Sequence, residues 1–449
     1  MAGTLGSGNT STKLAQIADL ARKHPDRVFS SLHHVIDVAL LRDAYRLTRK
    51  DAAAGVDGQS AEQYSRDLEK SLDSLHERFR SGKYYAPPVK RVHIPKGDGR
   101  TRPIGLPTFE DKVLQRAVAM VLEAIYEQDF HPNSYGFRPR RSAHGALQAI
   151  WETTTRIGGG WVLEVDIQAF FDTLDHGQLR SFLDKRVSDG VIRRAIDKWL
   201  KAGVLESGIV TVPEEGTPQG GVISPILANI YLHEVLDVWV ERDVKPLLHG
   251  DATLIRYADD FVIVFELGGD AKRVMEVLPK RFGKYGLTVH PDKTRLVKFN
   301  RPRPPGRKDD DDDGPGSFDF LGFTHHWGKS QKGTMVVRRQ TMRKRFTRGL
   351  ASIREWCRRN RHLPVAEQRR QLGLKLRGHY SYYGLIGNYA ALGRFLFEVK
   401  RTWHKWLARR SQRADSRWDH FQRIIQRFPL PAVRMIRREV QLKLSETRT

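Results

Sequence analysis

The feature that most constrains this chain is a pair of adjacent aspartates, Asp259 and Asp260, inside an apolar run from Leu254 to Phe265. The β-branched and aromatic residues on both sides are typical of two strands of a hairpin, with the carboxylates at or beside its turn. Two such charges about 4 Å apart repel each other by roughly 4 kcal/mol at an effective dielectric of about 20. A divalent cation would offset this repulsion, whereas an Asp-Asp turn that faces solvent would need none.

A third aspartate, Asp166, lies near the end of a buried-type strand predicted from Trp161 to Ile167. If this strand neighbours the hairpin in one sheet, three carboxylates converge. Hard oxygen ligands suit Mg²⁺, which keeps water and substrate phosphates as its other ligands. Two such ions can activate a 3′-hydroxyl and stabilise leaving pyrophosphate, which is the chemistry that a nucleic-acid polymerase needs.

The charge of the chain is concentrated in its last quarter. The net charge is +25, and residues 331–449 hold 30 Lys and Arg against 7 Asp and Glu. Most of these cations are arginines, which favour bidentate phosphate contacts and stacking. The pattern indicates a polyanionic partner, although a generally basic surface would have the same composition.

Other classes of protein are excluded by what the sequence lacks. One cysteine, Cys357, allows neither a disulfide framework nor a cysteine-based zinc site. The first residues carry no basic and apolar leader pattern, and no apolar run is long enough to cross a bilayer. We therefore expect a cytoplasmic, nucleic-acid-associated protein with no membrane partner.

The order of the expected elements divides the chain into three parts. Residues 1–60 are predicted to form a helical extension, and residues 61–330 alternate strands and helices, which indicates a mixed α/β module. Within that module, about residues 301–316 contain five consecutive aspartates and predict a disordered, solvated loop. Residues 331–449 are predicted to be a basic domain that is helical from Gly333 to near its end.

Seven groups of residues stand out between about residue 50 and residue 325. They are Ile94-Pro95-Lys96 with Arg102-Pro103-Ile104; Ser134 to Pro139 with Ser142-Ala143-His144; Asp166-Ile167 with Phe170-Phe171-Asp172; Gly216 to Gly221 with Ser224-Pro225; Tyr257 to Asp260; Gly286-Leu287 with Asp292-Lys293-Thr294; and Phe320 to Phe323. Their order and spacing resemble those of a reverse transcriptase, and the chain is most similar to group II intron-encoded and intron-like bacterial enzymes.

The resemblance implies an α+β right-hand polymerase, with fingers and a palm built on a ferredoxin-like antiparallel sheet. An all-helical thumb, or maturase domain, would follow. Asp166, Asp259 and Asp260 would be catalytic and, with Ile167, would bind two Mg²⁺ ions, for which Mn²⁺ may substitute. Asp172 and its neighbour Asp175 are expected to cap a helix instead.

The resemblance also implies a nucleotide site. Phe171 would exclude a 2′-hydroxyl and so select dNTPs, unless it is a plain core residue. Lys96 and Arg102 would clamp the triphosphate, unless they belong to a solvated turn. Gln219 would line the nucleotide pocket, and Lys293 would protonate or pair with pyrophosphate.

Arginines in two regions are candidates for binding nucleic acid. Arg138, Arg140 and Arg141 follow an aromatic motif and would grip template phosphates, or else they are surface charges. In the basic domain, the candidates are Arg377, Arg394 and Arg401. In its helix from Leu392 to Leu407, Trp403 and Trp406 share the apolar face, so we expect them to pack inward.

The resulting hypothesis is an RNA-directed DNA polymerase that uses an RNA template, a DNA or RNA primer and dNTPs. The template would be a group II intron RNA, and the protein would also act as a maturase in splicing and retrohoming. One alternative is a domesticated enzyme in phage defence or DNA repair. Another is a non-enzymatic RNA-binding splicing factor. No Cys/His cluster follows the basic domain, which argues against a zinc-dependent endonuclease in this chain.

Overall fold

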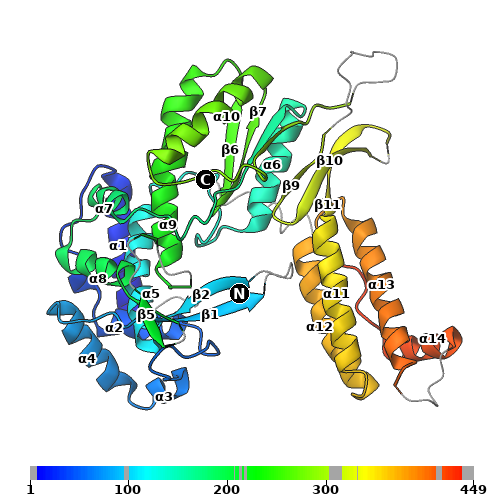
Figure 1. Cartoon of the computed structure of the whole chain (residues 1–449), viewed down its shortest axis with the longest axis horizontal. Helices are drawn as coiled ribbons and strands as arrows, with labels where there is room; N and C mark the ends of the chain where they lie inside the picture. The colour runs from blue at the N-terminus through cyan, green and yellow to red at the C-terminus, as the bar shows by residue number, and fades with distance from the viewer. Residues whose placement is uncertain are drawn as a thin grey trace. The chain divides into compact units, whose positions relative to one another are not determined.

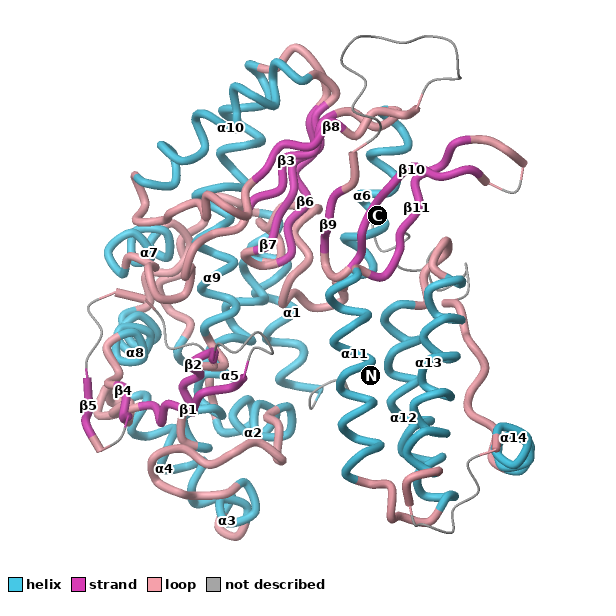
Figure 2. The backbone as a smooth tube through the Cα atoms, turned by 45° about the vertical axis from the view of Figure 1, so that its right-hand side comes forward, coloured by secondary structure: helices cyan, strands magenta, loops and turns pink. Residues whose placement is uncertain are grey.

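Figures 1 and 2 show the computed structural model, which describes residues 8–95, 101–206, 208–211, 215–216, 220–302, 316–330, 332–410 and 417–436. Two expected site residues, Lys96 and Gln219, lie outside these ranges, as does most of the expected acidic loop. The described residues form helices and largely antiparallel sheets, which confirms the α+β class.

The α-helices are α1 (Gly8–Lys23), α2 (Val38–Leu47), α3 (Ala61–Ser65), α4 (Leu68–Arg80), α5 (Phe109–Tyr126), α6 (Ala143–Ile157), α7 (His176–Asp184), α8 (Gly190–Leu200), α9 (Ser224–Leu232), α10 (Gly268–Gly283), α11 (Arg343–Arg359), α12 (Val365–Tyr383), α13 (Tyr389–Leu407) and α14 (Trp418–Arg427). Short 3₁₀ or π segments are η1 (His33–Val35), η2 (His233–Asp237), η3 (Val240–Val244) and η4 (Lys245–Leu247). The strands are β1 (Val89–Pro95), β2 (Thr101–Leu106), β3 (Trp161–Val165), β4 (Val204–Glu206), β5 (Ile209–Thr211), β6 (Ala252–Tyr257), β7 (Asp260–Phe265), β8 (Arg295–Lys298), β9 (Phe318–Phe320), β10 (Phe323–Lys329) and β11 (Met335–Thr341).

Two compact units are distinguished by their internal contacts. The first contains Met1–Ser142, Val165–Phe261 and Gly269–Arg295, and the second contains Ala143–Glu164, Val262–Gly268 and Leu296–Thr449. The division into parts at residues 60 and 330 remains a prediction.

Several helices begin where the sequence supplies a capping side chain. The carboxylate of Asp175 accepts the amide of Gln178 at the start of α7, as expected for a capping residue. Ser60 and Gln63 form a capping box at α3. Residues 61–80 form two helices rather than one, because Asp67 adopts φ −120° and ψ 41° between α3 and α4.

The first unit contains a four-stranded sheet in the order β2-β1-β4-β5. Its β1 and β2 pair antiparallel, so that Ile94 lies opposite Arg102. Both strands of this hairpin lie in the proline-rich stretch before Pro107. The hairpin leads into α5, which is buried along most of its length and forms the centre of this unit.

Another sheet has the order β6-β7-β3-β8 and contains the aspartate hairpin (Figure 2). β6 and β7 are adjacent and are joined only by Ala258 and Asp259, as the sequence predicts. The ring of Phe261 packs at 6.1 Å from that of Phe282 in α10. The turn between β6 and β7 is therefore supported by two strands whose side chains are largely buried and packed.

The second unit corrects one expectation. The chain is not helical directly after Gly333, because Met335–Thr341 forms β11, which pairs antiparallel with β10 in the sheet β11-β10-β9. Alternate residues Val337, Arg339 and Thr341 are buried in this strand. Such a period of two belongs to a half-buried strand, but it is short and directly precedes the longer helical pattern that begins at Arg343.

The helices α11, α12 and α13 run side by side in the second unit (Figure 1), and α14 packs on the same apolar cluster. Trp403 is completely buried there and donates its indole N–H to the Oε1 atom of Gln368 at 3.0 Å. Its predicted inward packing is confirmed, and Trp406 also packs against this cluster. Among the described residues, no helix is long and apolar enough to span a bilayer.

Candidate active site

The turn of the aspartate hairpin is held in an unusual backbone conformation. Ala258 has φ 58°, in the left-handed region that residues with a Cβ rarely occupy. Its neighbour across the chain is Gly136, where a Cβ atom would lie only 2.3 Å from the Ala258 amide nitrogen. A side chain at residue 136 is thus incompatible with this turn. Asp259 is half-buried and Asp260 is exposed on it.

Asp166 is placed by the segment that follows β3. Its carbonyl accepts the amide of His290 at 2.8 Å, and the amide of Gln168 donates to Thr288 O at 2.8 Å. These two bonds flank the bridge between Ile167 and Val289 and do not use the Ile167 carbonyl. The Asp166 carboxylate accepts a hydrogen bond from Lys293 Nζ. The predicted pairing partner of pyrophosphate is therefore already beside a predicted metal ligand.

The electrostatics of Asp259 connect it to two other predicted site residues. Burial raises the pKa of the Asp259 carboxyl above its usual value, and the negative charge of Asp166 adds to that effect. The backbone amide of Asp259 and the positive charge of Arg102 act in the opposite direction. Asp166 and Asp259 are 93 residues apart in sequence, but their charges interact in the fold. The charge of Arg102, from β2, also acts on Asp259.

The oxygen ligands of this site fit a divalent cation, but the expected convergence of three carboxylates is not found among the described residues. Within the parts of the chain that the structure describes, no group of three or more His, Cys, Asp or Glu side chains is placed to bind one metal ion. Asp166 and Asp259 interact, and their oxygens are the hard ligands that Mg²⁺ prefers. The counter-charge on Asp166 is supplied by Lys293.

Phe171 lies on a tight loop between Asp166 and α7. Ala169 has φ 47°, and its carbonyl accepts the amide of Asp172 at 2.7 Å, which closes the turn. The partly buried ring of Phe171 packs at 5.3 Å from the buried ring of Phe170. Gly216, at φ 85°, approaches this loop so closely that a Cβ atom there would lie 2.7 Å from the Phe171 carbonyl oxygen.

The glycines on either side of Gln219 contact both predicted parts of the nucleotide site. Whereas Gly216 meets the Phe171 loop, a Cβ atom on Gly220 would lie 2.4 Å from Gly105 O in β2. The turn that follows Gly220 is anchored to α5, because Gln115 Oε1 accepts hydrogen bonds from the amides of Val222 and Ile223 at 2.7 and 3.2 Å. Close backbone approach thus explains the glycine-rich motif.

Gln115 itself belongs to a buried network centred on Asp111. The Asp111 carboxylate accepts hydrogen bonds from Gln115, from Trp199 and from the hydroxyl of Tyr84. Burial raises the pKa of Asp111 to about 6 even though these bonds favour its charged form. The network ties α5 and α8 to the loop that carries the glycine motif.

The structure does not support a template contact for Arg138. Its side chain is 3% exposed and forms a salt bridge with Glu127, at 3.0 Å from Nε to Oε1. It also donates to the carbonyls of His131 and Ser134, both at 2.7 Å. A buried guanidinium whose donors are used in this way stabilises the loop and is not available to a phosphate.

The neighbouring arginines differ from Arg138. Arg140 is exposed, with φ 58°. Arg141 is partly buried, and its guanidinium lies 5.8 Å from the ring centroid of Tyr135. A role of these two residues at the template remains a prediction.

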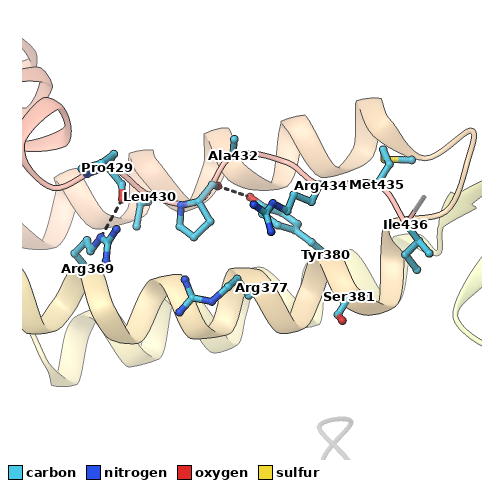
Figure 3. Close-up of a pocket in the computed structure, with 11 residues that line it drawn as sticks. Arg369, Arg377, Tyr380, Ser381, Pro429, Leu430, Ala432, Arg434, Met435 and Ile436 are labelled. Carbon is cyan, nitrogen blue, oxygen red and sulfur yellow. Dashed lines mark hydrogen bonds between the residues drawn. The ribbon is translucent and has the colours of Figure 1, made fainter. Parts of the chain in front are cut away.

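The predicted arginines of the second unit are exposed and occupy different surroundings. Arg394 lies over Phe346 at 5.1 Å, and Arg401 pairs with Glu398 at 3.2 Å. Arg377 instead lines a groove of about 690 Å³ between α12 and the segment 429–436 (Figure 3). Arg369 and Arg434 also line this groove, and the described lining contains no acidic residue.

A group of buried polar residues beneath the turn was not singled out from sequence. Arg256 is 0% exposed and lies among Asp237, Asn229 and the Ala258 carbonyl. A charged residue in the middle of the apolar run from Leu254 to Phe265 was the available signal. Buried charges are retained only where they are paired.

Comparison with known proteins identifies the class of this site. Residues 94–325 match the family model for reverse transcriptase (RNA-dependent DNA polymerase). The chain belongs to the reverse transcriptase family. Its matched region contains all three predicted catalytic aspartates.

The relatives are similar to this chain over different extents. Protein YkfC of Escherichia coli K12 is 34% identical over 58% of the chain and 77% of its own length. Group II intron-encoded protein LtrA of Lactococcus lactis is 37% identical over 49% of the chain, which spans 37% of LtrA. Nuclear intron maturase 2, a mitochondrial protein of Arabidopsis thaliana, is 30% identical over 43% of the chain and 30% of its own length. These names support the predicted similarity to group II intron reverse transcriptases and maturases.

Proposed function

We propose that this protein is an RNA-directed DNA polymerase that adds dNTPs to the 3′-hydroxyl of a primer. The single observation that carries the proposal is the interaction of Asp166 with Asp259 within the field of Arg102. Two carboxylates, one directly after β3 and one at the turn of the β6–β7 hairpin, whose charges influence each other and are offset in part by that of Arg102, fit the binding of a metal-bound triphosphate. Family membership adds the reaction class.

The metal ligands would be Asp166, Asp259 and Asp260, with the backbone of Ile167. Bound Mg²⁺, in two sites that Mn²⁺ can also fill, would lower the pKa of the primer hydroxyl and neutralise charge on the phosphates. Lys293 would leave Asp166 for the triphosphate, where its ammonium would pair with the leaving pyrophosphate. Arg102, together with Lys96, would orient the triphosphate from the fingers hairpin.

Phe171 is the proposed selector of the sugar. Its backbone is fixed by the Ala169 turn and by the approach of Gly216, and its ring packs against that of Phe170. Phe171→Ala is expected to reduce discrimination against ribonucleotides by about 100-fold, because the ring no longer occupies the space of a 2′-hydroxyl. The ratio of kcat/KM for dNTP and rNTP on one primer–template measures this.

An exposed phenylalanine provides the control for that experiment. Phe397→Ala removes the same side chain from α13, where it is 53% exposed, and the discrimination ratio should not change. If Phe171→Ala incorporates dNTPs normally and still rejects rNTPs, Phe171 is only a packing residue.

RNA binding is assigned to the groove of Figure 3. Its exposed Arg377 and Arg434, with the hydroxyl of exposed Ser381, offer cationic and hydrogen-bonding groups suited to a sugar-phosphate backbone. Arg377→Gln with Arg434→Gln is expected to reduce the slope of log affinity against log salt by about 1.4 to 1.8, which corresponds to two phosphate contacts. Fluorescence anisotropy with a labelled structured RNA at several salt concentrations measures the slope.

A matched double variant tests the location of these contacts. Arg358 and Arg370 lie on α11 and α12 and pair with glutamates on their own helices. Arg358→Gln with Arg370→Gln removes the same charge and should lower the slope by less than half as much. Equal slopes for the two double variants would show that the groove is not the RNA site.

The biological role that we propose is that of an intron protein, with a maturase activity on group II intron RNA and a part in retrohoming. The names of the relatives LtrA and nuclear intron maturase 2 support it. Sequencing the RNA that co-purifies with the protein from its host tests it. Enrichment of a group II intron is expected, whereas a phage or repair-associated RNA would favour a domesticated enzyme.

A further inference from the structure

The catalytic turn is built on a fully buried guanidinium. Arg256, two residues before Ala258 on β6, donates from Nε and Nη2 to the two carboxylate oxygens of Asp237 at 2.8 and 2.6 Å. Its remaining terminal nitrogen, Nη1, donates to Asn229 Oδ1 at 2.9 Å and to the Ala258 carbonyl at 3.1 Å. One rigid, planar side chain thus connects η2, α9 and the turn itself.

The second side of the turn is connected to the same group. Asn229 accepts from Arg256 and donates from Nδ2 to the carbonyl of Gly136 at 2.8 Å. Gly136 is the residue that packs against the Ala258 amide. The preceding segment runs along β6, because Tyr135 N donates to Arg256 O and Arg256 N donates to Asn133 O, at 2.8 and 2.9 Å.

These bonds end at the strained residue of the turn. Ala258 has a left-handed backbone, and such strain persists only where the surroundings determine it. The carbonyl of Ala258 accepts from Arg256, and its amide faces Gly136, which Asn229 holds. The next two residues, Asp259 and Asp260, are the proposed metal ligands, so the dihedral angles of Ala258 set the directions of their side chains.

We propose that Arg256, Asp237 and Asn229 are positioning residues that hold Ala258 in its left-handed conformation and thereby direct Asp259 and Asp260 toward the metal ions. The inference rests on the proposed polymerase site. The three side chains do not contact substrate, and they act through the turn. Their function is to preorganise ligands that would otherwise turn apart under mutual repulsion.

The test uses Arg256→Lys, which keeps the buried positive charge for Asp237 but loses the fork that reaches Asn229 and Ala258. The measured quantity is the affinity for Mn²⁺ alone, titrated by electron paramagnetic resonance on the full chain. The specific component is the binding that Asp259→Asn removes. Loss of an outer-shell partner is expected to weaken it by about 10-fold or more. The Mg²⁺ concentration for half-maximal dNTP incorporation should rise in parallel, with KM for dNTP changed less than twofold.

The matched control is Arg186→Lys. Arg186 is also buried, pairs with Asp129 at 2.8 Å and donates to backbone carbonyls such as Arg27 O, and these partners lie outside the turn. This substitution should lower thermal stability in a similar way and leave Mn²⁺ affinity within twofold. A general loss of stability would instead affect both variants alike.

A second-site change separates positioning from simple packing. Glycine adopts a left-handed backbone without strain, so adding Ala258→Gly to Arg256→Lys should restore a large part of the lost Mn²⁺ affinity. Asn229→Leu, which breaks the connection to Gly136, provides a second route to the same defect if Arg256→Lys does not fold.

The outcomes are distinguishable from failure of the polymerase proposal. A wild-type chain that binds Mn²⁺ through Asp259 but incorporates no dNTP would refute polymerisation and leave the positioning role testable by metal affinity. A folded Arg256→Lys and a folded Asn229→Leu that both bind Mn²⁺ as tightly as the wild type would refute the positioning role.

Discussion

Replacing Asp259 with asparagine is expected to reduce dNTP incorporation by at least about 1,000-fold, a loss of roughly 4 kcal/mol in transition-state stabilisation. The amide is nearly isosteric but lacks the charge that a divalent cation requires. Burial and Asp166 raise the pKa of Asp259, so its carboxylate is costly to hold without a cation. Extension of an oligo(dT) primer on poly(rA), followed in single-turnover experiments, measures the rate.

The same variant should retain its fold and its RNA affinity. Asp259→Asn removes one of two carboxylate charges that repel each other in the folded state. The thermal midpoint of the variant is therefore expected to equal or exceed that of the wild type. Asp251→Asn, at the opposite end of β6, is the matched control and should extend primers normally. If Asp259→Asn extends primers within tenfold of the wild-type rate, the metal assignment is wrong.

Replacing Arg256 with alanine is expected to reduce the free energy of unfolding by about 3–5 kcal/mol, because it leaves Asp237 buried without a partner. Asp237 is 1% exposed, and its carboxylate accepts two hydrogen bonds from the guanidinium. Chemical denaturation followed by circular dichroism measures the change. The exposed pair of Arg49 and Asp51 supplies the control, since Arg49→Ala should leave the free energy of unfolding nearly unchanged.

The loss of unfolding free energy in Arg256→Ala should depend on pH in a defined direction. Burial alone would raise the pKa of Asp237, but the charge and hydrogen bonds of Arg256, with help from His233, hold it below its ordinary value of 3.8. A depressed pKa in the folded state contributes stability that is fully present above about pH 4 and is lost as the pH falls toward the folded value. In Arg256→Ala, burial without the guanidinium raises the pKa of Asp237, so the variant becomes relatively more stable as its carboxyl takes up a proton on the way down to pH 4. The difference in unfolding free energy between wild type and Arg256→Ala should therefore begin to narrow above pH 4 and narrow further below it.

A double variant checks the cause. Removing both charges, as Arg256→Ala with Asp237→Leu, should recover a large part of the lost stability, because no unpaired charge then remains buried. Equal destabilisation by the single and double variants would instead mean that the loss comes from the cavity left by the arginine.

Motifs with strong local signals were predictable along the chain. The strands on either side of Asp259, the cap at Asp175 and the inward packing of Trp403 each follow from neighbouring residues and are confirmed. Strand β11 was missed, because its alternation is short and directly precedes the long helical pattern of α11. Pairing with β10 decides its structure, and that partner is invisible in a local pattern.

The direction of a charged side chain was much harder to predict. Arg138 follows a motif typical of the family and was expected at the template, yet it is turned inward to Glu127. Arg377, predicted on similar grounds, is exposed in a groove without acidic neighbours among its described lining. The sequence shows that an arginine is present. Only the packed structure shows whether its guanidinium already forms a salt bridge with an acidic side chain of the same protein.

By itself, the sequence determined the class of protein, because the hairpin, the glycine loop and the aspartates are short motifs that can be recognised by their residues and their order along the chain. It also placed two adjacent carboxylates between apolar strands, and left open whether a cation or solvent offsets their repulsion. The tertiary structure alone decided that Arg256 lies beneath the turn, that Gly136 packs on Ala258, and that Lys293 faces Asp166. These pairs join residues up to 127 positions apart, and burial, which gives each contact its strength, arises only when the chain has packed.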